Sequence, residues 1–261
     1  MVNCKNCETS CEDNYKFCPN CAQPTDTKRI DFHFLIHEIQ HRIFHMDKGI
    51  FYTLKELFTR PGYSIREYIE GKRQKHFKPI LLIMILGASY AILQHNLKVE
   101  AFLLDLLKTG NRDEIFFFQK FVDYIRAIEH WIDGHYAMYF LLQIPLVGLG
   151  FYWGFKKYHL YNYAEWLVIM TFMGGQMLAV SIVESLFDIL TLRLGILFFL
   201  AEVGLVLCTI IQLFQYHSKV KVILRTLISL LVSAFFILLV VTIVMAIGVY
   251  KSGGMELMER L

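Results

Sequence analysis

The chain has 261 residues, of which 56% are hydrophobic and 15% aromatic. Soluble domains contain roughly 45–50% apolar residues, so this composition excludes a typical soluble protein and predicts an all-α polytopic membrane protein. The formal net charge of +3 is small, and it gives no reason to expect nucleic-acid binding.

Five of the six cysteines lie within the first 21 residues. Four of them form two pairs in which two residues separate the cysteines, namely Cys4, Cys7, Cys18 and Cys21. Four thiolates at this spacing can complete a tetrahedral shell, so residues 1–24 are predicted to form a small ribbon around a structural zinc ion. The alternative is two disulfides, which a reducing cytosol disfavours.

Three further residues of this segment bear on the ribbon. Cys11 is left over and is interpreted as a spare thiol. The glycine that commonly follows such cysteine pairs is absent, and Glu8 and Ala22 stand in its place. The turn geometry is therefore a point that the sequence leaves open.

Residues 25–78 are predicted to form a cytosolic belt of interfacial helices. Residues 30–46 have helical periodicity, with apolar and histidine residues on opposite sides. The apolar side consists of Phe32, Leu35, Ile36, Ile39, Ile43 and Met46, and the histidine side of His33, His37, His41 and His45. Such a helix is expected to lie in the membrane interface.

Within this row, the sequence HEIQH places His37 and His41 one turn apart with Glu38 beside them, a pattern that supplies two metal ligands and a general base in zincin enzymes. The row, including His45, is a candidate site for a second divalent metal. A solvated polar face is the alternative, because the spacing identifies no third ligand.

The rest of the belt is strongly basic. Gly49 is expected to end the first helix and Arg60-Pro61-Gly62 to break the next, with a third short helix starting at 65–68 and ending at Gly71. Its main cations are Arg60, Arg66, Lys72 and Arg73. Positive charge beside a span is retained in the cytosol and attracts anionic headgroups of the bilayer. A phosphate-bearing ligand is a second interpretation.

Three stretches of this sequence are similar to a known family. They are CKNC with FCPNC, the run from His37 to Arg73 followed by Pro79, and YNYAEWLV at Tyr161 to Val168. The chain resembles an uncharacterised bacterial family of multi-pass membrane proteins with an amino-terminal zinc ribbon. The matching positions include His37, His41, His45, Asp47, Lys48, Gly49, Arg60, Pro61 and Gly62. The resemblance implies an architecture and a bacterial inner membrane, but no activity.

Residues 79–261 are predicted to form the transmembrane domain. We expect five spans, near 79–93, 136–155, 164–186, 194–216 and 226–250, with an extracytoplasmic helical insert at 98–133. The first is short and is expected to continue past Gln94. Basic residues follow the second span and precede the fifth, which predicts a cytosolic amino terminus and an extracytoplasmic carboxyl terminus. Gly148, Gly150 and Gly154 are expected to permit close helix packing.

Four charged residues fall within or beside the third and fourth spans: Glu184, Asp188, Arg193 and Glu202. Carboxylates are costly in hydrocarbon, so they usually face a partner or a water-filled cavity. Pairing with Arg193 would staple the helical hairpin, whereas a cation or proton path is the functional alternative.

Three functions are compatible with these patterns. A non-enzymatic scaffold or regulatory module, whose ribbon and belt engage a cytosolic protein partner, is favoured because no complete catalytic set is present. A transporter or pore would use the intramembrane carboxylates, and a metal-dependent enzyme would use the HEIQH motif. An oligomer is compatible with each of the three.

Overall fold

The computed structural model describes residues 1–41, 49–97, 124, 127–128, 131–132, 134–189 and 194–251. The chain begins with a small head in which strands β1 (Val2–Asn3) and β2 (Ser10–Cys11) pair antiparallel. Three short helices follow: α1 (Phe32–His41), α2 (Ile50–Thr59) and α3 (Pro61–Glu70). The predicted first helix is confirmed over α1, and its continuation to residue 46 lies outside the described residues.

The start of α3 differs from the prediction. The predicted break between the two helices is a single residue, Arg60, because α3 begins at Pro61 itself. Proline is well tolerated in the first turn of a helix, where its missing N–H has no intrahelical acceptor. The predicted end is confirmed, since Gly71 caps α3 in the left-handed conformation with φ of 114°.

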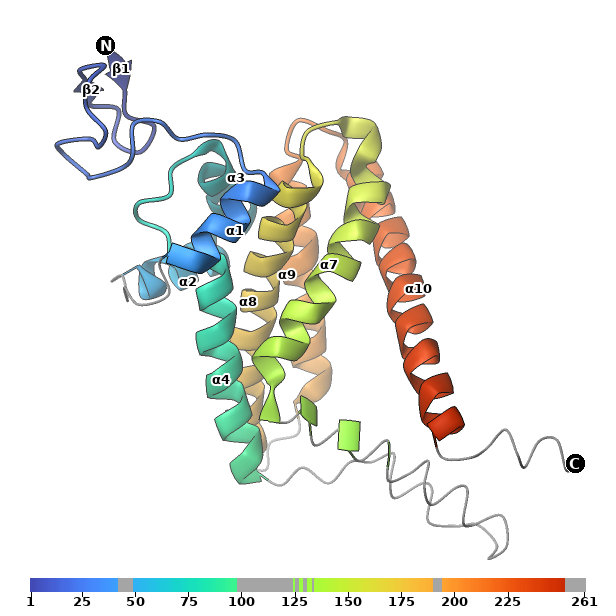
Figure 1. Ribbon diagram of the computed structural model, residues 1–261. Helices are drawn as coiled ribbons and strands as arrows, with labels where there is room; N and C mark the ends of the chain where they lie inside the picture. Colours follow the sequence, from blue (N-terminus) through green and yellow to red (C-terminus); the bar gives the residue numbers. More distant parts are fainter. Residues whose placement is uncertain are drawn as a thin grey trace, which may run out of the picture.

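The remaining helices form a bundle (Figure 1). They are α4 (Pro79–Leu97), α7 (Tyr136–Phe155), α8 (Tyr163–Ile189), α9 (Gly195–Leu213) and α10 (Lys219–Lys251), with a short 3-10 turn η1 (Lys156–Tyr158) after α7. Helix α8 contacts α4, α7 and α9, whereas α10 packs mainly against α7. In the most apolar segment of each helix, 61% of the residues of α8 are buried, compared with 6% of those of α10. Helix α8 is therefore the centre of the bundle.

Four of these helices, α7 to α10, are long and apolar enough to cross a membrane. The apolar part of α4, Pro79–Gln94, is shorter than a span, although the helix continues past Gln94 as expected. The coarse prediction of a helical polytopic membrane protein is thus supported with four candidate spans instead of five. Of the insert at 98–133, only Tyr124 and four neighbouring residues are described, and Tyr124 donates a hydrogen bond to Val244 O of α10 at 3.2 Å.

The head, α1 to α3, η1 and the first residues of α8 and α10 lie at one end of the bundle (Figure 1). The last turn of α10 lies at the opposite end. The five successive helices α4 and α7 to α10 run between these two ends, although only four of them are long and apolar enough to cross a membrane. We call the first of these ends the head end.

Helices α7 and α10 approach closely through small residues, as predicted. A side-chain Cβ at Gly150 would collide with Ser233, and one at Gly154 with Ser229. The guanidinium of Arg225 donates to Gly154 O at 2.6 Å and lies 4.7 Å from the centre of the Tyr158 ring. Small residues bring the two backbones together, and one arginine fixes their register at the head end.

Candidate functional site

The head brings the four predicted cysteines together. The Sγ atoms of Cys4, Cys7, Cys18 and Cys21 all lie within 4.8 Å of one another. Cys4 and Cys21 are 3.5 Å apart, as are Cys7 and Cys18, and all are free thiols, in contrast to the disulfide alternative. A tetrahedral zinc ion with Zn–S bonds near 2.3 Å would place its sulfurs about 3.8 Å apart. The donor set therefore fits a soft divalent metal such as zinc.

The two cysteine pairs form equivalent turns. In each, the first cysteine donates from its N–H to a carbonyl five residues later and accepts at its own carbonyl from a residue four later. These bonds are Cys4 to Thr9, Glu8 to Cys4, Cys18 to Gln23 and Ala22 to Cys18, at 2.8–2.9 Å. Glu8 and Ala22 have φ of 62° and 58°, so they adopt the left-handed conformation that glycine usually supplies. The missing glycines therefore leave the turn geometry intact.

The local environment gives the cysteines different pKa values. Burial raises the pKa of Cys4 to about 12, whereas hydrogen bonds with the side chain and backbone of Thr9 lower the pKa of Cys7 to about 6. Cys11 is 1% exposed and lies on β2, with its Sγ 3.5 Å from Thr9 O. It packs beside the four-cysteine cluster without belonging to it.

The linker after the head is clamped to the bundle. Arg29 donates to both carboxylate oxygens of Glu165 at 2.7 and 2.8 Å and to Leu160 O at 3.2 Å. Asn162 donates from its side chain to Ile30 O at 3.0 Å, and the Ile30 side chain is fully buried. Two consecutive linker residues are thereby held against the start of α8.

Glu165 also caps its own helix. It accepts a hydrogen bond from Asn162 N at 2.7 Å, while Asn162 Oδ1 accepts one from Glu165 N at 2.8 Å. This reciprocal pair is a capping box. The motif YNYAEWLV was noted in the sequence only as part of a family resemblance, although its Asn-x-x-Glu pattern could have identified the cap. No comparable sequence pattern identifies Arg29 as the partner of Glu165.

The belt arginines are used within the fold. Arg60 forms a two-point ion pair with Glu67, at 3.1 Å for each contact, and a second ion pair with Glu56. Arg66 donates to the last carbonyls of α9, Gln212 O at 2.7 Å and Leu213 O.

Arg73 and Gly62 also make contacts within the fold. Arg73 donates to Lys28 O at 3.0 Å and lies 4.4 Å from the centre of the Phe34 ring, while Lys72 is half-buried after α3. Gly62 packs directly on α9 and donates to Gln212 Oε1 at 3.0 Å. The Arg-Pro-Gly motif therefore joins α2, α3 and α9.

The predicted histidine row falls partly outside the described residues. His37, Glu38 and His41 lie on α1, with the histidines four residues apart, but their side chains are not among those described, and His45 lies outside. The second metal site remains a prediction. His76, which follows α3, is buried against the rings of Tyr52 and Tyr68, and burial lowers its pKa.

The intramembrane carboxylates are brought together in part. Glu184 on α8 lies beside the start of α9, since a Cβ at Gly195 would be 3.5 Å from its Oε1. Glu184 and Glu202 are near enough to interact electrostatically. The Asp188 side chain and Arg193 lie outside the described side chains, so the predicted staple and the predicted ion path both remain predictions.

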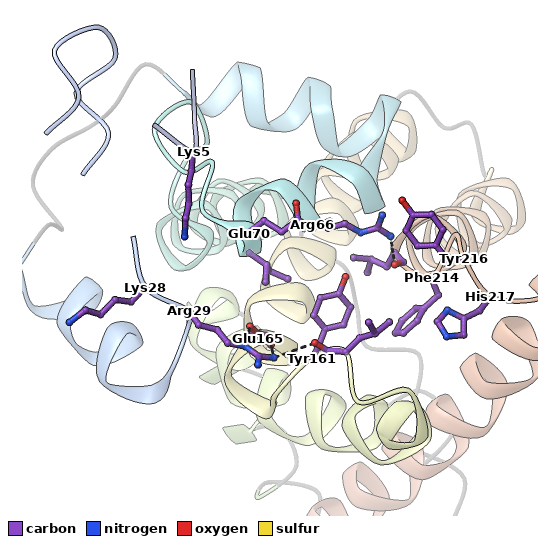
Figure 2. Close-up of a pocket in the computed structure, with 13 residues that line it drawn as sticks. Lys5, Lys28, Arg29, Arg66, Glu70, Tyr161, Glu165, Phe214, Tyr216 and His217 are labelled. Atoms are coloured by element: carbon purple, nitrogen blue, oxygen red, sulfur yellow. Dashed lines mark hydrogen bonds and ion pairs between the residues drawn. The ribbon is translucent and has the colours of Figure 1, made fainter. Parts of the chain in front are cut away.

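A cavity of about 630 Å³ lies between the head, its linker and the bundle (Figure 2). Its polar wall is formed by Lys5, Lys28, Arg29, Arg66, Glu70 and Glu165, and its aromatic wall by Tyr161, Phe214 and Tyr216. The cavity is thus lined by the head, its linker, α3, the start of α8 and the residues at and after the end of α9.

These features define a polytopic helical membrane protein with a four-cysteine head. Residues 47–90 match the model of a family described as a protein of unknown function (DUF3667). The matched segment contains α2, α3 and much of α4, including the Arg-Pro-Gly motif. No curated protein and no solved structure matches the chain. The similarity supports the resemblance to an uncharacterised family inferred from the sequence.

Proposed function

We propose that this protein is a non-enzymatic membrane scaffold that presents a zinc-loaded head to a protein partner in the cytosol of a bacterium. The observation that carries this proposal is the two-point bond between Arg29 and Glu165, because it fixes the head's linker to the central helix. A head held in this way is displayed in one orientation instead of moving on a flexible tether.

The exposed surface of the head suits this role. Tyr15 and Phe17, beside the second cysteine pair, have 40% and 55% of their surface exposed. Aromatic side chains are enriched in protein interfaces because they combine a large contact area with few rotatable bonds. The belt arginines support the head indirectly, since Arg73 holds the linker carbonyl of Lys28.

The same end of the bundle carries the flanking basic residues. Lys156 and Lys157 lie in η1, and Lys219 begins α10, at the head end of the bundle. Positive residues beside spans are retained in the cytosol, which supports placing the head inside and the carboxyl terminus outside in the bacterial inner membrane.

The test is photo-crosslinking in intact cells. A photo-reactive amino acid is placed at Phe17 in the full chain, and a matched one at Trp153 on α7, which is 62% exposed. The proposal predicts a protein adduct from position 17 that disappears when Cys18→Ser removes a metal ligand. Absence of a protein adduct, or equal adducts with and without Cys18, would overturn it.

A further inference from the structure

We propose that the cavity between the head and the bundle binds a phosphate-bearing anion, as presented by an anionic lipid headgroup or a soluble phosphate compound. The cavity lies where residues far apart in the sequence converge (Figure 2). Lys5 comes from the head, Lys28 and Arg29 from the linker, and Arg66 from α3. The inference is independent of the proposed partner, because it concerns a different surface.

The charge of the cavity is the first argument. Four basic side chains line it against two acidic ones, and one of the acids, Glu165, is already bound by Arg29. Lys5 and Arg66 therefore line the cavity beside Glu70, which is exposed, whereas Lys28 Nζ lies 3.8 Å from Asp26 Oδ2. Gathering like charges is unfavourable, and an anion placed among them would offset this repulsion.

Two of these cations, Lys5 and Arg66, are held in place before any ligand arrives. Lys5 Nζ donates to Thr27 O at 2.7 Å, so its stem is anchored at the rim. Arg66 is fixed by the carbonyls at the end of α9 and lies 5.8 Å from the centre of the Tyr216 ring. Side chains that are already ordered lose little conformational entropy on binding, which favours affinity.

The size and walls of the cavity indicate more than a bare inorganic ion. A volume of about 630 Å³ falls in the range of ordinary ligand pockets. The aromatic rings of Tyr161 and Phe214 offer an apolar surface beside the charges. Burial raises the pKa of Tyr161 while its hydrogen bond with Arg66 opposes this, so its hydroxyl is retained as a neutral hydrogen-bonding group. A phosphate with an attached organic group fits this division.

The position of the cavity gives the last argument. Its walls include the residues that precede α8 and those that follow α9, so it lies level with the ends of two candidate spans. Lipid phosphates occupy this level in a bilayer, just outside the hydrocarbon core. Basic pockets between helices on the cytoplasmic side are known to hold such headgroups.

The first arm of the test uses the full-length protein in neutral detergent, titrated with inorganic phosphate at constant ionic strength set with sodium chloride. The second arm uses nanodiscs of phosphatidylcholine with and without phosphatidylglycerol. Both arms measure the midpoint of thermal unfolding, which rises when a ligand binds the folded state. A second readout is Trp166 fluorescence in a Trp131→Phe, Trp153→Phe background, because Trp166 packs against the cavity residues Tyr161 and Phe214.

The variants are Lys5→Gln and Lys28→Gln, with Lys16→Gln on the head and Lys55→Gln on α2 as matched controls. The controls are exposed lysines that do not line the cavity. Lys5→Gln is expected to weaken phosphate binding about fivefold, Lys28→Gln to weaken it less because the Lys28 ammonium also meets Asp26, and the controls to change nothing.

The outcomes separate the two sources of phosphate. A lysine-dependent effect of phosphatidylglycerol supports a lipid headgroup, and a lysine-dependent effect of inorganic phosphate alone supports a soluble phosphate compound. If neither additive stabilises the protein, the inference is overturned. It is also overturned if the control substitutions weaken the stabilisation as much as Lys5→Gln does. Neither result depends on a crosslink from Phe17.

Discussion

Glu165 on the central helix binds Arg29, 136 residues earlier in the chain, through two hydrogen bonds. The two partners differ in environment, since the carboxylate side chain is 3% exposed and the guanidinium side chain 62% exposed. A buried carboxylate is stable only when its charge is compensated. The pair therefore links the position of the head linker to the stability of the bundle.

Arg29→Ala should lower the free energy of unfolding by about 1–2 kcal/mol, less than for a fully buried pair because the arginine is largely exposed. Glu165→Ala should cost about 1 kcal/mol more, since it also removes the capping box. Thermal unfolding in detergent measures both, with the neighbouring exposed Lys28→Ala as control. Equal losses for Arg29→Ala and Lys28→Ala would contradict the assigned role.

The purified protein should contain one zinc ion per chain, held by the four-cysteine cluster. Cys18→Ser should abolish metal content, because a structural site needs all four thiolates. Cys11→Ser is the matched control and should retain it, since Cys11 packs beside the cluster. Metal analysis by mass spectrometry decides this, and loss of metal from the Cys11 variant would show a different ligand set.

Glu8→Gly and Ala22→Gly should each strengthen metal binding by the head. Both residues hold left-handed backbone, which costs non-glycine residues about 1–2 kcal/mol. Relief of this cost should raise the metal affinity by about fivefold, measured by competition with a chromophoric chelator. Lys16→Gly, at a position without positive φ, should bring no gain. A similar gain at all three positions would rule out the backbone explanation.

Gly154→Ala should destabilise the bundle by about 1–3 kcal/mol, the usual cost of overpacking. An added Cβ would meet Ser229 on α10 and lie 3.3 Å from Arg225 O. Gly204→Ala on α9 is the control, because a Cβ there meets nothing within 4 Å. Thermal unfolding should separate the two variants, and identical midpoints would show that α7 and α10 are not closely packed in solution.

Stability should depend on pH through His76. Burial lowers its pKa in the folded state, so below about pH 6.5 the unfolded chain binds a proton that the folded chain resists. Stability is full above that pH and is lost as the pH falls toward the folded-state pKa, by at most about 1.4 kcal/mol per unit. His76→Phe should flatten this part of the profile between pH 7 and pH 5, as a denaturant series would show. Parallel profiles for both proteins would exclude His76 as the cause.

Local patterns in the sequence predicted the features that depend on local physics. The cysteine spacing identified the four clustered thiols, because two cysteines separated by two residues lie on one small turn and are therefore close together. Hydropathy identified α7 to α10 because a span must bury about 20 consecutive apolar residues. The helix after Arg60 was placed too late, because Pro61-Gly62 resembles a turn and yet starts α3 on the surface of α9.

Contacts between distant segments could not be predicted. The positive charge of Arg66 was readable in the sequence, but the position of its guanidinium at the end of α9 was not. The pairing of Arg60 with Glu56 was readable as a spacing of four on one helix face, whereas Arg29 and Glu165 share no sequence relationship. The partners of such side chains can be identified only from the folded bundle.

Lys5 lies between Cys4 and Cys7, and its side chain reaches Thr27, Gly71 and the rim of the cavity. A metal that orders this turn therefore also orders one of the charges that would meet an anion. Thermodynamic linkage makes such an effect mutual, so that each ligand raises the affinity for the other by the same factor. The head would then report on the membrane surface as well as on metal supply, and a chelator would weaken phosphate binding to the same degree that phosphate strengthens metal retention.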